Sequence, residues 1–124
     1  MTTWSENDLE LIGGSGELLI AVQRDDGTLR RWTPIWVVRA NDGVYVRSWY
    51  RRDTGWFGAA LRSRRARIRV PGLEAGVVVT DVGEGPAGLR DSVDAAYRGK
   101  YGDSASTSMV GAPAAATTLR LDPE

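Results

Sequence analysis

Short apolar segments separated by turn residues recur along the chain and limit the folds that it can adopt. The clearest is ARIRV at residues 66–70, where apolar residues alternate with arginines, as in a strand with one face against a core. Asp-Gly and Asn-Asp-Gly turns separate earlier segments of this kind, and a Pro-Gly pair ends this one. The pattern predicts strands at residues 17–24, 33–40, 44–50, 66–70, 76–82 and 117–123.

Three other segments have the caps or the periodicity of helices. Residues 5–12 begin at a serine N-cap and end before two glycines. Residues 54–64 follow Asp53 or Thr54 as a cap, and residues 88–102 have charged pairs spaced i,i+4. Residues 104–116 are rich in small side chains without a pattern and are predicted to be a loop.

The order of these elements predicts a mainly β fold. The first three strands should form a meander, and six antiparallel strands on so short a chain tend to curl and close, because closure removes exposed edges. We therefore predict a single domain, residues 1–124, that is a six-stranded antiparallel β-barrel with two or three short helices.

Composition narrows the chemistry. The chain has no cysteine and no histidine, so thiol chemistry, imidazole acid-base chemistry and a metal site are not expected, and no catalytic residue can be named. The acidic N-terminal segment is unlike a signal peptide, and no apolar run approaches the roughly 20 residues that span a bilayer. A cytoplasmic protein without a membrane partner is expected.

Charge is segregated along the chain although the net charge is zero. Residues 24–69 hold 12 of the 15 arginines against four acids, whereas residues 1–23 hold four acids and no base. This asymmetry predicts a basic surface or cleft suited to an anionic small molecule. The zero net charge argues against a nucleic-acid partner.

The run TPIWVVRANDGVYVRSWYRRDTGWFGAALRSRRARIRV, together with AAYRGKYG and TLRL near the C-terminus, carries a family resemblance. It resembles an uncharacterised small bacterial branch of the split-barrel proteins that include deazaflavin-dependent nitroreductases and, more distantly, pyridoxamine-phosphate oxidases. The resemblance implies a six-stranded split barrel, a homodimer, and an FMN or deazaflavin cofactor in a groove at the subunit interface.

The same resemblance implies site residues. Arg47 and Ser48 would lie near the cofactor phosphate or ring edge, and Thr54 would help to hold an anion at a helix N-terminus. Apart from the resemblance, Arg51 and Arg52 lie in the loop that enters this helix, where they could meet a phosphate or could be solvated side chains of an exposed loop. One departure is the hairpin QRDDGTLRR, which carries two acids where cofactor-binding members of the class have a basic hairpin.

Several residues have two readings. Trp36, Trp49 and Trp56 could form a wall for a flat ring or could be anchors of the core or of a dimer interface. Arg47 could bind an anion or form a structural ion pair, for instance with Asp53. Tyr97 could donate a hydrogen bond to a substrate, or it could be a packing residue of an amphipathic helix with its hydroxyl at the rim. The stripe of Arg65, Arg67 and Arg69 could be a solvated or edge-strand face.

Two functions remain open from the sequence. The first is a flavin- or deazaflavin-binding oxidoreductase. The second is a barrel without a cofactor that binds a small hydrophobic or anionic metabolite, which the acidic hairpin favours. A homodimer is expected with either function, because the strands at 33–40 and 44–50 carry bulky side chains on both faces and a second subunit would cover the outer one.

Overall fold

The computed structural model describes residues 3–48, 55–83, 85–86 and 88–124. Within these ranges, seven strands form one antiparallel sheet in the order β2-β1-β5-β6-β7-β4-β3. The strands are β1 (Leu18–Val22), β2 (Thr33–Ile35), β3 (Val38–Ala40), β4 (Gly43–Val46), β5 (Arg65–Val70), β6 (Leu73–Asp81) and β7 (Leu119–Pro123). The helices are α1 (Glu6–Gly14), α2 (Gly55–Ser63), α3 (Leu89–Tyr101), α4 (Asp103–Val110) and α5 (Ala112–Ala115). The prediction of a mainly β antiparallel barrel with peripheral helices is confirmed.

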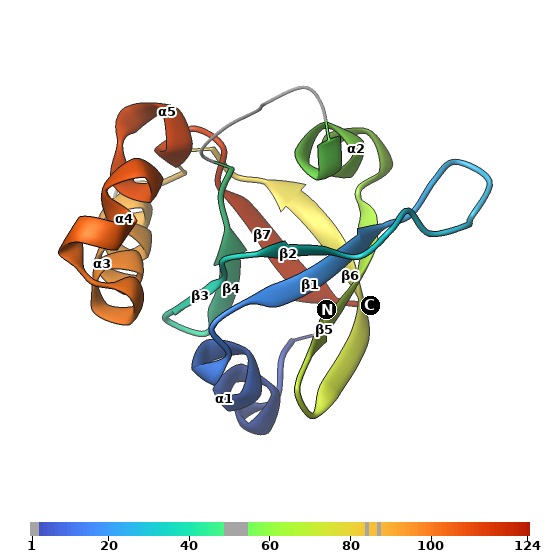
Figure 1. The fold of residues 1–124 in the computed structure, drawn as a ribbon, viewed down its shortest axis with the longest axis horizontal. Coiled ribbons are helices and arrows are strands. Elements are labelled where there is room, and N and C mark those ends of the chain that lie inside the picture. Colours follow the sequence, from blue (N-terminus) through green and yellow to red (C-terminus); the bar gives the residue numbers. More distant parts are fainter. Residues whose placement is uncertain (1–2, 49–54, 84, 87) are drawn as a thin grey trace.

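The sheet is so strongly curled that its two edge strands come close to each other. β2 and β3 are the edge strands, yet only Trp36 and Val37 separate them along the chain. Because a chain extends at most about 3.6 Å per residue, the last residue of β2 and the first of β3 lie within about 11 Å of each other. The two edges therefore face each other across a split, as the ribbon shows (Figure 1).

The prediction of one strand over residues 33–40 is wrong for this reason. β2 pairs with β1, whereas β3 pairs with β4 at the other edge, so the backbone changes partner between Ile35 and Val38. This division makes seven strands instead of six. Both antiparallel pairings of the predicted meander are confirmed, since β1 pairs with β2 and β3 pairs with β4, but the division of the middle strand places the two pairs at opposite edges of the sheet.

The interior of the barrel holds the main core. Alternate residues of the strands point inward, including Ile20, Val44, Ile68 and Leu121, none of which is exposed to solvent. The predicted inward face of residues 66–70 is confirmed, since Ala66, Ile68 and Val70 are all buried. α1 and α2 lie at opposite ends of the curled sheet (Figure 1), and α1 begins at the predicted N-cap Ser5, whose hydroxyl accepts from the backbone N–H of Asp8.

A second apolar layer lies outside the barrel. Side chains of β3 and β4 pack there against α3 and α4, forming a cluster of Val38, Ala40, Tyr45, Val93, Tyr97 and Met109. The loop predicted for residues 104–116 is wrong, because α4 and α5 occupy it; α4 packs beside α3, and α5 follows at the end of this pair (Figure 1). The chain thus covers the outer face of β3 and β4 with its own helices, so the need for a second subunit there does not hold.

The arginine stripe of β5 lies on a solvated face. Arg67 and Arg69 both pair with Glu74 of β6, at 3.2 and 2.8 Å, and Arg65 pairs with Glu124 at 3.2 Å. β5 lies between β1 and β6, so the edge-strand alternative is wrong and the solvated face is confirmed. In the described part of the chain, no helix is long and apolar enough to cross a membrane.

Candidate functional site at the split of the barrel

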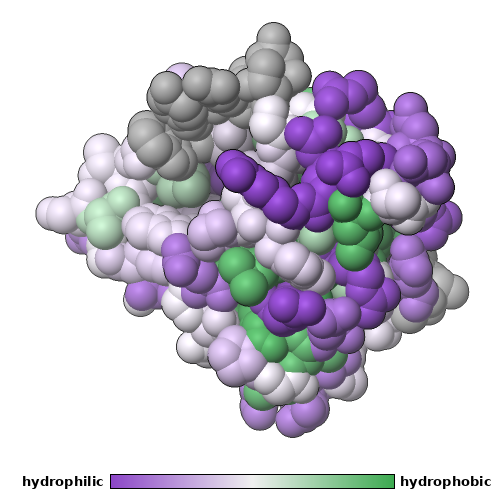
Figure 2. Space-filling model, turned by 45° about the vertical axis from the view of Figure 1, so that its right-hand side comes forward, coloured by the Kyte–Doolittle hydropathy of each residue, from purple (hydrophilic) through white to green (hydrophobic). Residues whose placement is uncertain are grey.

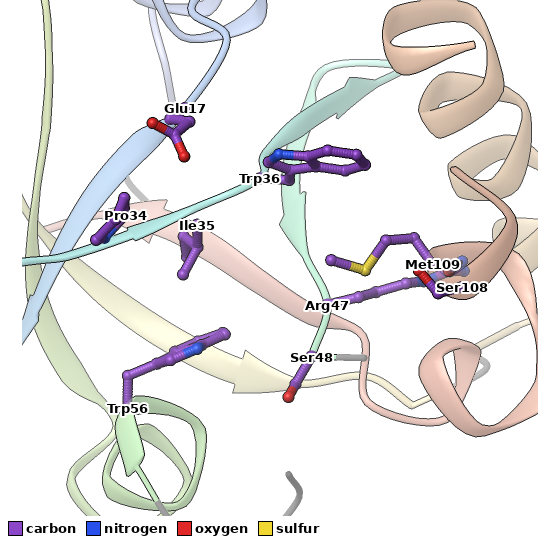
Figure 3. Close-up of a pocket in the computed structure, with 9 residues that line it drawn as sticks. All are labelled: Glu17, Pro34, Ile35, Trp36, Arg47, Ser48, Trp56, Ser108 and Met109. Atoms are coloured by element: carbon purple, nitrogen blue, oxygen red, sulfur yellow. The ribbon is translucent and has the colours of Figure 1, made fainter. Parts of the chain in front are cut away.

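The split opens into a pocket of about 260 Å³, here called the split pocket. It lies where β2 ends and β4 ends, between α2 and α4 (Figure 3). Its lining residues are Glu17, Pro34, Ile35, Trp36, Arg47, Ser48, Trp56, Ser108 and Met109. The change of partner between β2 and β3 thus creates both the gap in the sheet and the pocket that occupies it.

Two side chains of α3 bind the backbone at the split. The backbone N–H of Val37 donates to the Tyr101 hydroxyl at 3.2 Å, and this hydroxyl donates to the Gly16 carbonyl at 2.7 Å. The Lys100 ammonium donates to the Val37 carbonyl at 2.7 Å. These bonds replace the strand partners that Val37 lacks, which explains how a buried backbone can break its ladder here.

Aromatic side chains form two sides of the pocket. The Trp36 indole stacks on the Tyr101 ring with centroids 3.9 Å apart and an angle of 3° between the planes. Trp56 meets the edge of Phe57 at 5.7 Å and 86°. Figure 3 shows Trp36 and Trp56 on opposite sides of the pocket, with Ile35 on one flank and Met109 on the other. The pocket therefore offers flat apolar surfaces to a ring.

Arg47 lines the pocket with its stem while its guanidinium points into the protein (Figure 3). The residue is 1% exposed, and its Nη1 bonds the Asp94 carboxylate at 2.5 Å and the Met109 carbonyl at 2.8 Å. Its Nε donates to the Thr118 hydroxyl at 2.8 Å. Its Nη2 is buried and has no hydrogen-bond partner among the described residues. The guanidinium thus joins β4 to α3, α4 and the segment before β7.

The Arg47 pair belongs to a larger charged cluster. Asp94 also lies 3.5 Å from the Nε of Arg90, one helical turn earlier on α3. Two guanidinium groups therefore surround one buried carboxylate, and the structural reading of Arg47 holds with Asp94 as the partner. Asp53, the partner considered from the sequence, lies outside the described residues.

Tyr97 lies beside the buried Arg47 guanidinium and does not line the split pocket. It is fully buried, and the Arg47 guanidinium lies 5.5 Å from the centre of its ring. Burial raises the pKa of the Tyr97 phenol, and the nearby Arg47 charge offsets only part of this effect. The phenol is therefore neutral at physiological pH and contributes to the second apolar layer.

A second hollow of about 240 Å³ adjoins the split pocket and shares Trp56 with it. We call it the arginine hollow; its lining residues are Val22, Arg30, Arg31, Thr33, Gly55 and Trp56. Arg30 and Arg31 are exposed, and Gly55 is the first residue of α2. On the face with the β1–β2 hairpin and α2, Figure 2 shows hydrophilic side chains gathered above smaller hydrophobic patches. Cationic side chains and a helix N-terminus together favour an anion.

The acids of the β1–β2 hairpin do not line the arginine hollow but a neighbouring depression, and Arg30 lines both. The Asp26 carboxylate accepts from the backbone N–H and the hydroxyl of Thr28 at 2.9 and 2.6 Å, and these bonds lower its pKa. Asp25 and Asp26 line another depression with Arg24, Arg62 and neighbouring residues. The hairpin acids therefore close the turn, while Arg31 faces the arginine hollow without an acid in its lining.

The structure brings together part of the predicted site. Trp36, Arg47 and Ser48 line the split pocket, and so does Trp56 of the predicted aromatic wall. Tyr97 does not line it. Trp49, Arg51, Arg52 and Thr54 lie outside the described residues. Their proposed contacts with a cofactor stay predictions.

Sequence reasoning missed the contributions of α4 and of α3 to the site. Ser108 and Met109 line the pocket from a segment that was predicted to be a loop. Lys100 and Tyr101, which belong to the AAYRGKYG segment, bind the backbone at the split from outside. Among the described residues, no group of three or more acids lies together in a way that could hold a metal ion.

A curled antiparallel sheet with helices on its outside and a pocket at its open seam defines a split β-barrel protein. Within this class, the chain belongs to the bacterial family described as "uncharacterized protein conserved in bacteria" (DUF2255), whose sequence profile matches residues 8–121. No curated protein matches the sequence of this chain.

Solved structures share the fold at low sequence identity. A conserved hypothetical protein of Mycobacterium tuberculosis, Rv2991, is 14% identical with a TM-score of 0.59 over 97% of this chain and 79% of its own. A NimC/NimA family protein of Clostridium acetobutylicum is 14% identical, with a TM-score of 0.55 over 94% and 78%. A putative 5-nitroimidazole antibiotic resistance protein of Bacteroides thetaiotaomicron is 13% identical, with a TM-score of 0.60 over 99% and 81%. At these identities the likeness establishes the fold alone.

Proposed function

We propose that the chain is an oxidoreductase that binds a flavin- or deazaflavin-type cofactor across the split pocket and the arginine hollow. The observation that carries this proposal is that the two cavities adjoin at Trp56, one flat and aromatic and the other cationic. A phosphorylated flavin has the same two parts, a planar ring system and an anionic tail.

The dimensions suit a ligand divided between the cavities. Each has a volume below the roughly 300–1,000 Å³ of typical small-molecule sites, so neither alone suits a complete flavin nucleotide. The split pocket has room for a ring between Trp36 and Trp56, with the Tyr101 ring supporting the far face of Trp36. The arginine hollow has room for a phosphate beside Arg30 and Arg31.

The chain's own residues would orient the cofactor and exclude water. Such a cofactor supplies hydride transfer, so a chain without histidine or cysteine is adequate for the reaction. Ile35 and Met109, both buried, would shield the ring from solvent. Arg30 and Arg31 would hold the anion by charge-assisted hydrogen bonds. Arg47 would act by holding α3 and α4 in place, because its guanidinium bonds Asp94 and Met109.

Titration with FMN tests this proposal directly. We expect FMN or a phosphorylated deazaflavin to bind with a dissociation constant in the micromolar range and to quench tryptophan fluorescence. Replacing Trp56 with alanine should weaken binding about tenfold, since stacking on an aromatic side chain contributes roughly 1–3 kcal/mol.

The matched control is Trp32→Ala. Trp32 is half-buried and lies outside both cavities. The central carbon of the Arg69 guanidinium lies 4.2 Å from the centre of its ring. This variant should bind FMN like the parent chain. Absence of binding of either cofactor at tens of micromolar, in a folded parent chain, would remove the proposal.

A second candidate function is binding of a small flat or anionic metabolite without a cofactor. The small volume of the split pocket and the acidic hairpin beside the arginine hollow favour it. One structural relative is named as a 5-nitroimidazole resistance protein, so a 5-nitroimidazole is a suitable probe. Quenching by this probe, with no response to FMN, would favour the second function over the first.

We also propose that the protein forms a homodimer with the split pocket near the interface. Light scattering should then give twice the 13.5 kDa mass of one chain. The outer face of β3 and β4 does not support this assembly, because α3 and α4 cover it, and Leu29 is the one exposed large apolar side chain among the described residues. A mass of 13.5 kDa at high micromolar concentration would contradict the dimer and leave the site within one chain.

A further inference from the structure

Lys100 is the single lysine of the chain, and it lies in a hollow between α1 and α3. The hollow has a volume of about 430 Å³ and is lined by Leu9, Glu10, Gly13, Val38, Arg39, Ala96 and Lys100. It is separate from the split pocket and from the arginine hollow, since no lining residue is shared. The walls are mostly apolar, with one primary amine among them.

The surroundings of the amine give it a larger neutral fraction than a lysine in water has. Lys100 is partly buried, and its Nζ has one hydrogen bond, to the Val37 carbonyl, while lying 5.2 Å from the centre of the Tyr101 ring. Burial lowers the pKa of this amine to about 8. Two charged groups share the hollow: Glu10, which is exposed, and Arg39, whose guanidinium binds the Glu6 carboxylate at 3.0 Å. Neither forms an ion pair with Lys100 among the described residues.

We propose that Lys100 is a site of Nε-acylation by acyl thioesters, with the acyl group lying in this hollow beside Ala96. The neutral Nζ attacks the thioester carbonyl carbon and forms a C–N bond, while the C–S bond breaks. The sulfur leaves with the bonding electron pair and receives the proton that the nitrogen loses. The products are an amide and a free thiol, and no oxidant or metal is required.

Acylation at this position acts on the split of the barrel. It removes the positive charge that holds the Val37 carbonyl, and Val37 adjoins Trp36 of the split pocket. The proposal does not depend on the cofactor, because both its geometry and its test concern the other side of the split.

The test compares Lys100 in the folded chain with the same residue in urea. Both samples are incubated at pH 7.5 with a small acetyl thioester, S-acetyl-N-acetylcysteamine, and acetylation is followed by mass spectrometry of the peptide that contains Lys100. We expect the folded chain to react about tenfold faster or more, since each unit by which the pKa is lowered gives tenfold more free amine. The folded-state rate should level off near pH 8, and the unfolded-state rate above pH 10.

Two variants complete the experiment. Ala96→Leu fills the apolar wall and leaves the amine, so it should slow acetylation of the folded chain several-fold and leave the unfolded rate unchanged. Lys100→Arg keeps the charge and should abolish acetylation at this position. Equal or slower reaction in the folded chain than in urea would overturn the proposal, as would a normal rate in a folded Ala96→Leu variant.

Discussion

Replacing Asp94 with alanine is expected to lower the free energy of unfolding by about 3–5 kcal/mol, because it leaves the Arg47 guanidinium buried without its counterion. Arg47 is 1% exposed and Asp94 is 7% exposed, so water cannot replace the lost partner without a change in the packing of α3. The remaining bonds of Arg47, to Thr118 and Met109, are to neutral groups. Urea unfolding followed by circular dichroism measures the loss.

Two further variants separate the charge effect from general damage. Removal of both charges, with Arg47→Met and Asp94→Leu together, should restore most of the stability, since buried ion pairs can often be replaced by apolar residues. Glu74→Ala breaks the exposed pairs with Arg67 and Arg69 and should leave stability almost unchanged. A similar loss in the Asp94 and Glu74 variants would contradict the special role of the buried pair.

The second large effect is expected from reversing two charges in the arginine hollow. Arg30→Glu together with Arg31→Glu should weaken FMN binding about a hundredfold or more, because each hydrogen bond to a charged phosphate contributes about 1.5–3 kcal/mol. Riboflavin, which has the same ring and no phosphate, should bind the double variant as it binds the parent chain. Fluorescence titration of both ligands measures the difference.

A control of equal charge is available on the same chain. Arg64→Glu together with Arg98→Glu gives the same change in net charge, and both residues are exposed and outside the two cavities. This control should keep FMN affinity within a few-fold at moderate salt. An equal loss of affinity in both double variants would show that only the overall field matters, and the arginine hollow would no longer be a phosphate site.

The sequence predicts those parts of the fold whose signal is local. The alternation of ARIRV specifies β5 and its buried face, and the charged pairs and tyrosines of residues 88–102 specify α3. The division at Trp36 and Val37 leaves no local signal, because both halves of the segment have strand character and the change lies in their partners. α4 is missed for another reason: its small polar residues have weak helical preference, and packing on α3 stabilises it.

The residues of the candidate site are likewise predicted only where the signal in the sequence is local. One stretch of sequence predicts Trp36, Arg47 and Ser48 as site residues, and all three line one pocket. The direction of the Arg47 guanidinium could not be predicted, because its partner Asp94 is 47 residues away on a helix with several acids and bases. The sharing of Trp56 between two cavities depends on how α2 meets the end of β2, which spacing along the chain does not reveal.

The position of β7 affects how a ribosome-bound chain can fold. Of the seven strands described, β7 comes last in the sequence, yet it lies between β6 and β4 in the sheet. Until it emerges, the β3–β4 hairpin has no strand through which to join the β2-β1-β5-β6 half, and the nascent chain holds two separate sets of paired strands. Closure of the barrel is therefore a late, long-range event, with β4 pairing to β7 across more than 70 residues of sequence, as between Val44 and Leu121. The split pocket, which is lined from the ends of β2 and β4, can therefore take its final shape only after translation has passed residue 121.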